Sequence, residues 1–307
     1  MKYVLEYPSE QPIAPVDFLR PEVIREVVVR AEAVGFDAVA LSEHPAPSAK
    51  WRGAGGHETL DPIAALGFVA GVTTRLRLLT NLYVLPFRNP YLSAKALGSL
   101  DIVSGGRLIA GVGAGYLRAE FAALGVDHER RAALFDEALG ALRSIWTDPA
   151  SPVSGTGFGA PGETWSQRPV QLPYPPIWIG GNGAAARRRV VVHGDGWMPI
   201  IAAARMAAAM RTTALETPEQ FGTAVDRLRR DLERAGRDPE SVTIQVVCPH
   251  FRFDDSASVA EARAVLADLG KRGATSAVVH ADGSSPAATA AFLDRFGETF
   301  HDDWRTS

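Results

Sequence analysis

Short apolar segments alternate with longer amphipathic segments from one end of this 307-residue chain to the other. The longer segments carry apolar residues at helical spacing, whereas the short ones have the length and composition of buried strands. The segments interpreted as strands are residues 4–7, 37–42, 76–84, 107–113, 177–179, 196–199, 243–248 and 276–281. Strands and helices that alternate eight times close into a barrel far more often than they form an open sheet. We therefore predict an α/β fold, a single (β/α)₈ TIM barrel that forms one domain over residues 1–307.

Several predicted helices begin at recognisable capping sequences. Asn89 precedes Pro90 at the start of one helix, and Ser285 precedes Pro286 at the start of the last. Thr217 opens a capping box, with a glutamine three residues later. Side-chain oxygens at these positions accept hydrogen bonds from backbone N–H groups that the first helical turn leaves free.

Two segments do not fit the barrel repeat. Residues 147–175 are rich in Pro, Gly and Ser, and we predict an excursion loop without a regular element. Residues 200–216 are too long for a simple connection. They form either a mobile wall with Met206 and Met210 facing an apolar ligand, or an extra packed helix.

Composition excludes several classes of protein. The formal net charge of −3 gives no basic footprint for nucleic acid. No apolar run approaches the ~20 residues of a membrane span, and the first residues lack a signal segment. Cys248 is the only cysteine, which rules out a disulfide framework and a cysteine-rich zinc site. We expect a cytoplasmic protein.

Barrel active sites lie at the C-terminal ends of the strands, which limits the candidate residues. The candidates are Ser42 to His44, Asn81 to Leu85, Gly111 to Tyr116, Gly180 to Gly183, Cys248 to His250, and His280 to Asp282. His44 is the strongest candidate, because a histidine there can give or take a proton near neutral pH. The alternative is a loop histidine bonded to a backbone carbonyl.

A metal site is a second possibility at the same end of the barrel. Glu43, His44, His57, His250 and His280 would be its ligands if they converged. The sequence contains no H-x-H or H-E-x-x-H spacing, and these residues belong to separate strands. We predict no metal, and we expect His250 and His280 to be ordinary polar residues at strand ends.

Glycines follow the fifth predicted strand. Gly180, Gly181, Asn182 and Gly183 separate the apolar strand from an alanine-led helix. Glycines allow a sharp turn and a close approach, and the helix N-terminus favours a phosphate. The turn is therefore a candidate anion site, although such turns also occur with nothing bound. The following run, Arg187 to Arg189, is either a solvated face or supplies one arginine to an anionic tail.

A second glycine-rich segment, residues 111–121, leaves the fourth predicted strand. It forms either a wall where a planar ring touches the backbone or a turn needed only for packing. In the first interpretation Tyr116 is an aromatic side of the wall, and Arg118 and Glu120 are polar neighbours.

Four motifs together resemble the luciferase-like monooxygenase superfamily, especially its branch that uses the deazaflavin coenzyme F420. They are GFDAVALSEH (35–44), LTNLYVLPFRNPYLSAKALGSLDIVSGGR (79–107), GVGAGYLRAEFAALGV (111–126) and PPIWIGGNGAAARRRVVVHGDGWMP (175–199). The stretch from Leu85 to Arg107 is the most specific of them.

The resemblance implies that an isoalloxazine-like ring lies at the strand C-termini. It places a non-proline cis peptide at Asn81-Leu82, behind the ring, and the cofactor phosphate at Gly180, Gly181, Asn182 and Gly183. His44 corresponds to the histidine that faces the ring. Tyr116 lies where one subfamily has an acidic residue, so that subfamily's proton donor is not carried over, and Glu120 or His44 is expected to serve instead.

The implied reaction is hydride transfer between the deazaflavin and a small organic substrate. Two alternatives stay open: an FMN-dependent monooxygenase on the same barrel, and a catalytically idle protein that only binds a flavin. The resemblance further implies a homodimer.

Overall fold

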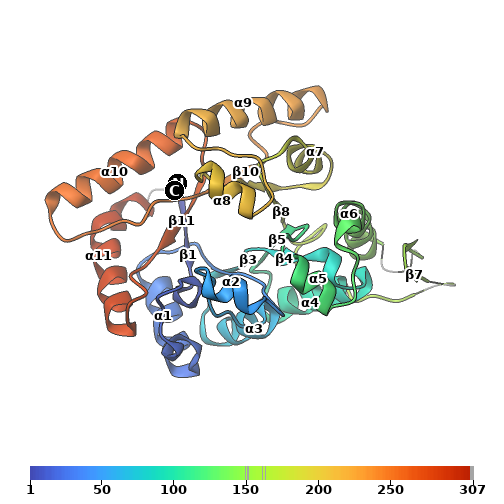
Figure 1. Cartoon of the computed structure of the whole chain (residues 1–307), viewed down its shortest axis with the longest axis horizontal. Helices are drawn as coiled ribbons and strands as arrows, with labels where there is room; N and C mark the ends of the chain where they lie inside the picture. Colours follow the sequence, from blue (N-terminus) through green and yellow to red (C-terminus); the bar gives the residue numbers. More distant parts are fainter. Residues whose placement is uncertain (149, 151, 161, 163, 305–307) are drawn as a thin grey trace.

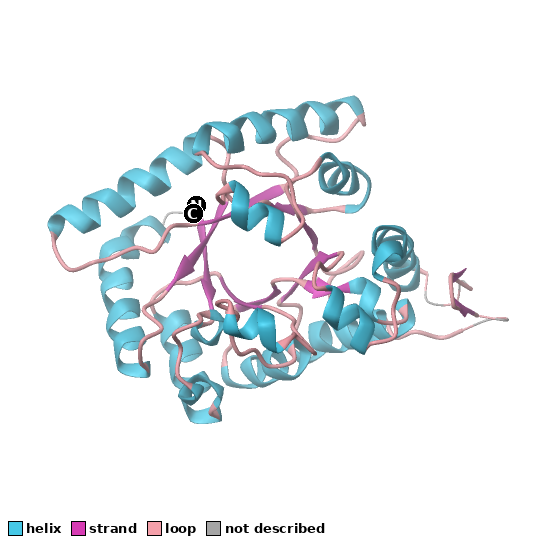
Figure 2. Ribbon diagram, in the orientation of Figure 1, coloured by secondary structure: helices cyan, strands magenta, loops and turns pink. Residues whose placement is uncertain are grey.

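The computed structural model describes residues 1–148, 150, 152–160, 162 and 164–304. Parallel strands form a closed ring that helices surround (Figure 2), which confirms the predicted (β/α)₈ barrel. The strands of the ring are β1 (Lys2–Glu6), β2 (Ala38–Leu41), β3 (Arg77–Thr80), β4 (Tyr83–Val84), β5 (Leu108–Gly113), β8 (Ile177–Gly180), β9 (Gly196–Met198), β10 (Thr243–Val247) and β11 (Ser276–His280). They follow one another in chain order, and pairing of β3 with β5 closes the ring.

The helices of the outer layer follow the strands as predicted (Figure 1). They are α1 (Pro21–Ala33), α3 (Pro62–Val72), α4 (Pro90–Val103), α6 (Arg131–Thr147), α7 (Ala184–His193), α9 (Pro218–Arg234), α10 (Ser256–Lys271) and α11 (Pro286–Trp304). The predicted N-caps are confirmed: Asn89 accepts a hydrogen bond from the Tyr91 N–H, and Thr217 accepts one from the Gln220 N–H. The capping box at Thr217 is not completed, because the Gln220 side chain accepts from the Glu216 N–H instead. The Ser285 hydroxyl likewise accepts one from the Ala288 N–H.

Short helices that the sequence pattern did not reveal occupy the connections. α2 (Ala49–Gly53) follows β2, and α5 (Arg118–Ala123) follows β5. Single 3₁₀ turns cover Pro8–Glu10, Val16–Leu19, Leu85–Phe87 and His128–Arg130. Helices of five or six residues leave too few apolar positions for a periodic signal.

Apolar side chains fill the inside of the barrel and the space between the strands and the helices. The inner cluster consists of Val4, Ala38, Ala40, Leu79, Ile109, Trp178, Met198 and Val278. Side chains alternate between the two faces of a strand, so residues two positions apart share a face. Glu6 and His280 lie two residues beyond Val4 and Val278, and they therefore face the lumen at its C-terminal mouth.

The third predicted strand, residues 76–84, is not continuous. It is divided into β3 and β4, which both pair with β5. The peptide bond between Asn81 and Leu82 is cis, which confirms the position that the family resemblance implied. A period-two pattern cannot reveal such a break, because apolar residues continue on both sides of it.

Leu82 explains why glycines surround this break. A Cβ on Gly180 would lie 2.2 Å from Leu82 Cδ1, and a Cβ on Gly113 would lie 2.8 Å from the same atom. A Cβ on Gly111 would lie 2.0 Å from the Thr80 carbonyl oxygen. The glycine-rich segment after the fourth predicted strand therefore has a packing role, and its interpretation as a wall for a planar ring stays a prediction.

The two excursions contain regular elements. The expectation of no regular element in residues 147–175 is wrong, because β6 (Ser154–Gly155) and β7 (Phe158–Gly159) form an antiparallel hairpin. Strands of two residues are too short for an alternation signal; positions 149, 151, 161 and 163 lie outside the described residues. In residues 200–216, α8 (Ala204–Ala209) packs through buried Ala207 and leaves Met206 56% exposed. This fits the extra packed helix. In the described part of the chain, no helix is long and apolar enough to cross a membrane.

The space at Gly111 predicts a destabilising substitution. Gly111→Ala should lower the free energy of unfolding by about 1–3 kcal/mol, because the new Cβ meets backbone that cannot turn away. Gly140→Ala is the matched control: Gly140 lies inside α6 with nothing within 4 Å of an added Cβ, and alanine should stabilise that helix by about 0.5–1 kcal/mol. Chemical denaturation measures both values. Wild-type stability of Gly111→Ala would contradict the packing account.

Candidate active site

The residues predicted around His44 come together at the mouth of the barrel. His44 Nδ1 lies 3.2 Å from Glu120 Oε1; the Glu120 side chain is buried, and that of His44 is 10% exposed. The ring centroids of Trp51, His57 and Tyr116 lie 4.5, 5.4 and 6.1 Å from that of His44. The histidine is thus held by a carboxylate and enclosed by aromatic rings, and not by the backbone carbonyl of the alternative interpretation.

The Glu120 contact determines which nitrogen of His44 can react. A carboxylate only accepts hydrogen bonds, so Nδ1 must carry a hydrogen to donate to Glu120. Nε2 is then the nitrogen left for a ligand. Burial raises the pKa of Tyr116, which keeps its phenol protonated beside this pair. His44, Tyr116 and Glu120 are predicted from the sequence, whereas Trp51 is not, because it belongs to the short helix α2, which carries no periodic signal.

A second buried carboxyl group lies next to this cluster. The Ser42 N–H donates to Glu10 Oε2 at 3.1 Å, and the Thr59 hydroxyl donates to Oε1 at 3.1 Å. His57 Nδ1 lies 3.9 Å from Glu10 Oε2. Burial, with a smaller contribution from the charge of Glu6, raises the pKa of Glu10 from 4.5 to about 8. Glu10 is therefore mainly neutral at pH 7, and burial also lowers the pKa of His57.

The other proposed metal ligands have separate partners. Glu43 forms an ion pair with Arg88 and accepts a hydrogen bond from the Val84 N–H at 2.6 Å, so it braces β4. His280 Nδ1 lies 2.6 Å from Glu6 Oε2 in a half-buried pair. The His250 ring packs against the His280 ring at a tilt of 30°. Among the residues that the structure describes, no three His, Cys, Asp or Glu side chains are grouped to hold a metal ion.

The glycine-rich turn after β8 is tied to the segment that follows β9. Gly181 has a φ of +109°, and its N–H donates to the Met198 carbonyl at 3.3 Å. The Asn182 N–H donates to the Thr212 hydroxyl at 2.9 Å. The Asn182 side chain donates to the carbonyls of Ile200 and Thr213 and accepts from the Ile200 N–H. The backbone N–H groups of Gly181 and Asn182 are thus both engaged in hydrogen bonds within the protein.

Beyond Asn182, the start of α7 is open to an anion. Gly183 is its N-cap residue, and no side chain caps the helix. A cavity of about 570 Å³ lies against this end, with Gly183, Ala184, Arg187 and Arg227 among its lining residues. The first N–H groups of a helix and its dipole favour an anion. Of the predicted arginine run, Arg187 borders this cavity, whereas Arg189 pairs with Asp136 on the outside.

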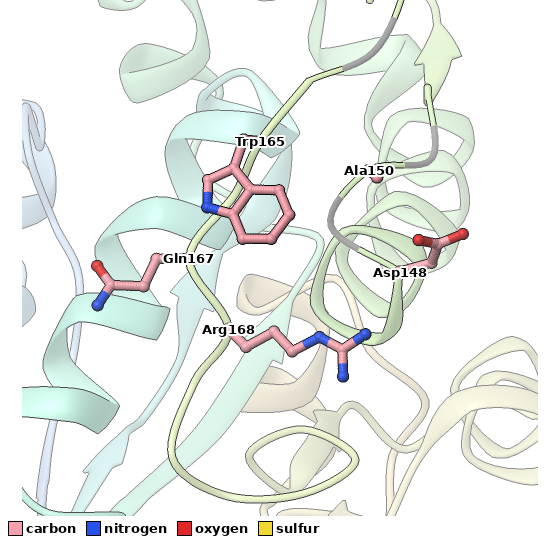
Figure 3. Close-up of a pocket in the computed structure, with 5 residues that line it drawn as sticks. All are labelled: Asp148, Ala150, Trp165, Gln167 and Arg168. Carbon is pink, nitrogen blue, oxygen red and sulfur yellow. The ribbon is translucent and has the colours of Figure 1, made fainter.

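A second cavity, of about 480 Å³, lies elsewhere on the molecule (Figure 3). It is lined by Asp148, Ala150, Trp165, Gln167 and Arg168, beside the C-terminal end of α6. Helices of this fold run opposite to the strands, so that end of α6 belongs to the face away from the mouth. The cavity is therefore separate from the polar groups around His44.

Comparison with known proteins assigns the chain to a family. The model of the luciferase-like monooxygenase family matches residues 5–301. A phthiodiolone/phenolphthiodiolone dimycocerosates ketoreductase of Mycobacterium bovis is 28% identical over 186 residues, which are 60% of this chain and 45% of that protein. This chain thus spans about half the length of the curated relatives that it matches.

Solved structures agree in fold. The monooxygenase RslO1 from Streptomyces bottropensis superposes with a TM-score of 0.80 at 22% identity, over 99% of this chain and 100% of that one. The coenzyme F420-dependent tetrahydromethanopterin reductase from Methanopyrus kandleri gives a TM-score of 0.72 at 15% identity, over 99% of each chain.

The raised pKa of Glu10 predicts a pH-dependent stability. The folded chain keeps a proton on Glu10 that the unfolded chain releases, so the free energy of unfolding should fall by a few kcal/mol, as an order of magnitude, as pH rises from about 4.5 to about 8. Glu10→Gln, which is neutral at every pH, should flatten this fall. Denaturation at several pH values measures it, with exposed Glu261→Gln as the control. An unchanged slope in Glu10→Gln would contradict the assignment.

Proposed function

This chain belongs to the luciferase-like monooxygenase family, and from that membership we propose that it is an oxidoreductase that transfers a hydride between the deazaflavin coenzyme F420 and a small organic substrate. The observation that carries the proposal is the His44–Glu120 pair, 3.2 Å apart, at the C-terminal mouth of the barrel. A half-buried histidine with one nitrogen fixed by a carboxylate suits a group that faces a cofactor ring.

Each part of such a cofactor has a proposed place among the residues around the mouth. The ring is proposed to rest on the Asn81–Leu82 break, between His44 and Tyr116. Its phosphate would lie at the turn formed by Gly180, Gly181, Asn182 and Gly183. The uncapped start of α7 supports this placement. Because the amides of Gly181 and Asn182 have internal partners, Gly183 and the first turn of α7 would donate to the phosphate.

Each of these side chains has a proposed task. The coenzyme supplies the hydride acceptor or donor, and the protein orients it and keeps water away. His44 would present Nε2 to the ring while Glu120 holds Nδ1 in place. Trp51 and Tyr116 would exclude water from that contact, since both rings pack around the imidazole.

Two observations favour the deazaflavin over FMN. Arg187 and Arg227 border the cavity at the proposed phosphate site, where guanidinium groups would meet an acidic tail. One relative of similar fold is named as F420-dependent, and a curated relative is named as a ketoreductase. A carbonyl group that accepts a hydride is accordingly the proposed substrate function.

We expect the purified chain to bind F420 tightly and FMN weakly or not at all. Gly181→Val should weaken F420 binding, because valine is strained at a φ of +109° and shifts the turn. Gly67→Ala, in open space on α3, should bind like wild type. Fluorescence titration with both cofactors gives the dissociation constants.

In the same series, His44→Ala should stay folded and lose cofactor affinity, or lose roughly 10²–10⁴-fold in hydride-transfer rate. Copurification with stoichiometric FMN would reject the deazaflavin proposal. Unchanged affinity of Gly181→Val would reject the phosphate site, and wild-type behaviour of His44→Ala would reject its role.

We further propose that the chain is a homodimer. Leu92 and Val103 on α4 are 63% and 66% exposed, and Leu172 is 76% exposed. The Val170 and Gln171 N–H groups donate to Asp101, which holds this loop on α4. An apolar surface of this kind is typical of a contact between subunits. Light scattering should give twice the mass of 32.8 kDa, and a monomer at micromolar concentration would contradict it.

A further inference from the structure

Glu6 and His280 form a second carboxylate–imidazole pair at the mouth. They are direct neighbours in the pairing of β1 with β11. His280 Nδ1 lies 2.6 Å from Glu6 Oε2, and the two side chains are 12% and 19% exposed. Both belong to the face of their strands that points into the lumen, as Val4 and Val278 do one layer below. The pair therefore borders the space in which a substrate would bind.

The contact with Glu6 leaves one nitrogen of His280 free. Nδ1 donates to the carboxylate, and Nε2 forms no hydrogen bond with the described residues. The ring of His250 packs against that of His280 with centroids 4.7 Å apart and an angle of 30°. A histidine fixed in this way accepts a proton at Nε2 when neutral and donates one when charged.

The charges near His280 favour its protonated form. Burial alone lowers the pKa of His280, but the hydrogen bond and charge of Glu6 outweigh burial and leave that pKa raised. Burial and the neighbouring His280 lower the pKa of His250. Glu10, the other carboxyl group that interacts with Glu6, is mainly neutral at pH 7 because its pKa is raised to about 8. Glu6 is thus the group whose charge raises the pKa of His280.

The order of the strands places this pair across the mouth from the proposed phosphate site, the turn after β8. Around the ring, β1 lies four positions from β8, and β11 lies four positions from β5. In a barrel of eight positions these are opposite walls. The His44–Glu120 pair and the Asn81–Leu82 break lie between them on the β2 and β3 side. Because β1 pairs with β2, the Glu6–His280 pair borders the part of the mouth next to His44 and the break, where a ring resting on the break would have its edge.

We propose that His280 exchanges a proton with the oxygen of a ketone or secondary alcohol substrate, and that Glu6 is its positioning residue. This inference rests on the proposed function. In ketone reduction the carbonyl carbon receives the hydride from the reduced deazaflavin, and the carbonyl oxygen takes the proton from His280 Nε2. The C=O π bond is replaced by one C–H and one O–H bond, the deazaflavin is oxidised, and His280 regains its proton from water. The reverse sequence oxidises the alcohol.

The first experiment does not depend on turnover. Diethyl pyrocarbonate acylates unprotonated, accessible imidazole nitrogens, and peptide mass mapping of the full chain identifies the histidines modified at each pH. His280 should react with a midpoint at higher pH than His193, whose pKa burial lowers. Glu6→Gln should shift the His280 midpoint to lower pH and leave His193 unchanged. The proposal would be overturned if His280 did not react, or if the pH midpoint of its acylation were the same in Glu6→Gln as in the wild type.

The second experiment uses the chain loaded with reduced F420 and cyclohexanone as the probe. His280→Gln should lower kcat roughly 10²–10⁴-fold with little change in KM or in the dissociation constant of F420. The wild-type rate should fall as pH rises through the pKa of His280, and Glu6→Gln should move that fall to lower pH. His193→Gln, at the far end of α7, should match wild type throughout.

The outcomes separate this inference from the proposed function. A chain that does not bind F420 contradicts the proposed function, and the acylation result then decides whether His280 is a free acid–base group. A chain that binds F420 and reduces the probe equally fast with His280→Gln retains the proposed function and overturns the role of His280. The isosteric Glu6→Gln variant keeps the test decisive if His280→Gln does not fold.

Discussion

The closure of the barrel depends on three glycines that pack against the break between β3 and β4. Leu82 turns its side chain into the space above Gly113 and Gly180, and Gly111 lets β5 approach Thr80. A methyl group at any of these glycines would meet atoms closer than van der Waals contact allows. Since β3 and β4 both pair with β5, the same glycines hold the ring closed and shape one wall of the mouth. The polar groups on the other side of the mouth keep their position relative to this wall only while the glycine packing is intact.

The mouth combines two imidazole–carboxylate pairs of different origin. Glu6 and His280 extend from adjacent strands, so the sheet itself sets their separation. His44 and Glu120 come from the connections after β2 and β5, and α5 must be folded to bring them together. Buried carboxylates are costly unless they are paired or neutral, and each of these groups meets that condition. Glu43 is paired with Arg88, and Glu10 keeps its proton near pH 7.

The sequence predicted what is local and periodic. The alternation of segments predicted the barrel, and Asn89, Thr217 and Ser285 predicted helix starts that the structure confirms. The family resemblance, and no periodic pattern, located the cis bond at Asn81-Leu82. The pair of Glu6 and His280 was missed because its members are 274 residues apart, and only the closed ring brings them together. Glu10 was missed because its importance comes from burial, which a single turn after a strand does not reveal.

Asn182 uses its side chain and its backbone N–H to hold the segment that follows β9. Its amide side chain holds Ile200 and Thr213, and its N–H holds the Thr212 hydroxyl. Lifting that segment away from the barrel would break these bonds and free the turn beside α7. Binding of an anion at the turn and closing of the segment are then two steps of one thermodynamic cycle. The free energy by which a bound anion stabilises the closed segment therefore equals the free energy by which the closed segment stabilises the bound anion. Amide hydrogen exchange in this segment, measured with and without the anion, would report both binding and closure.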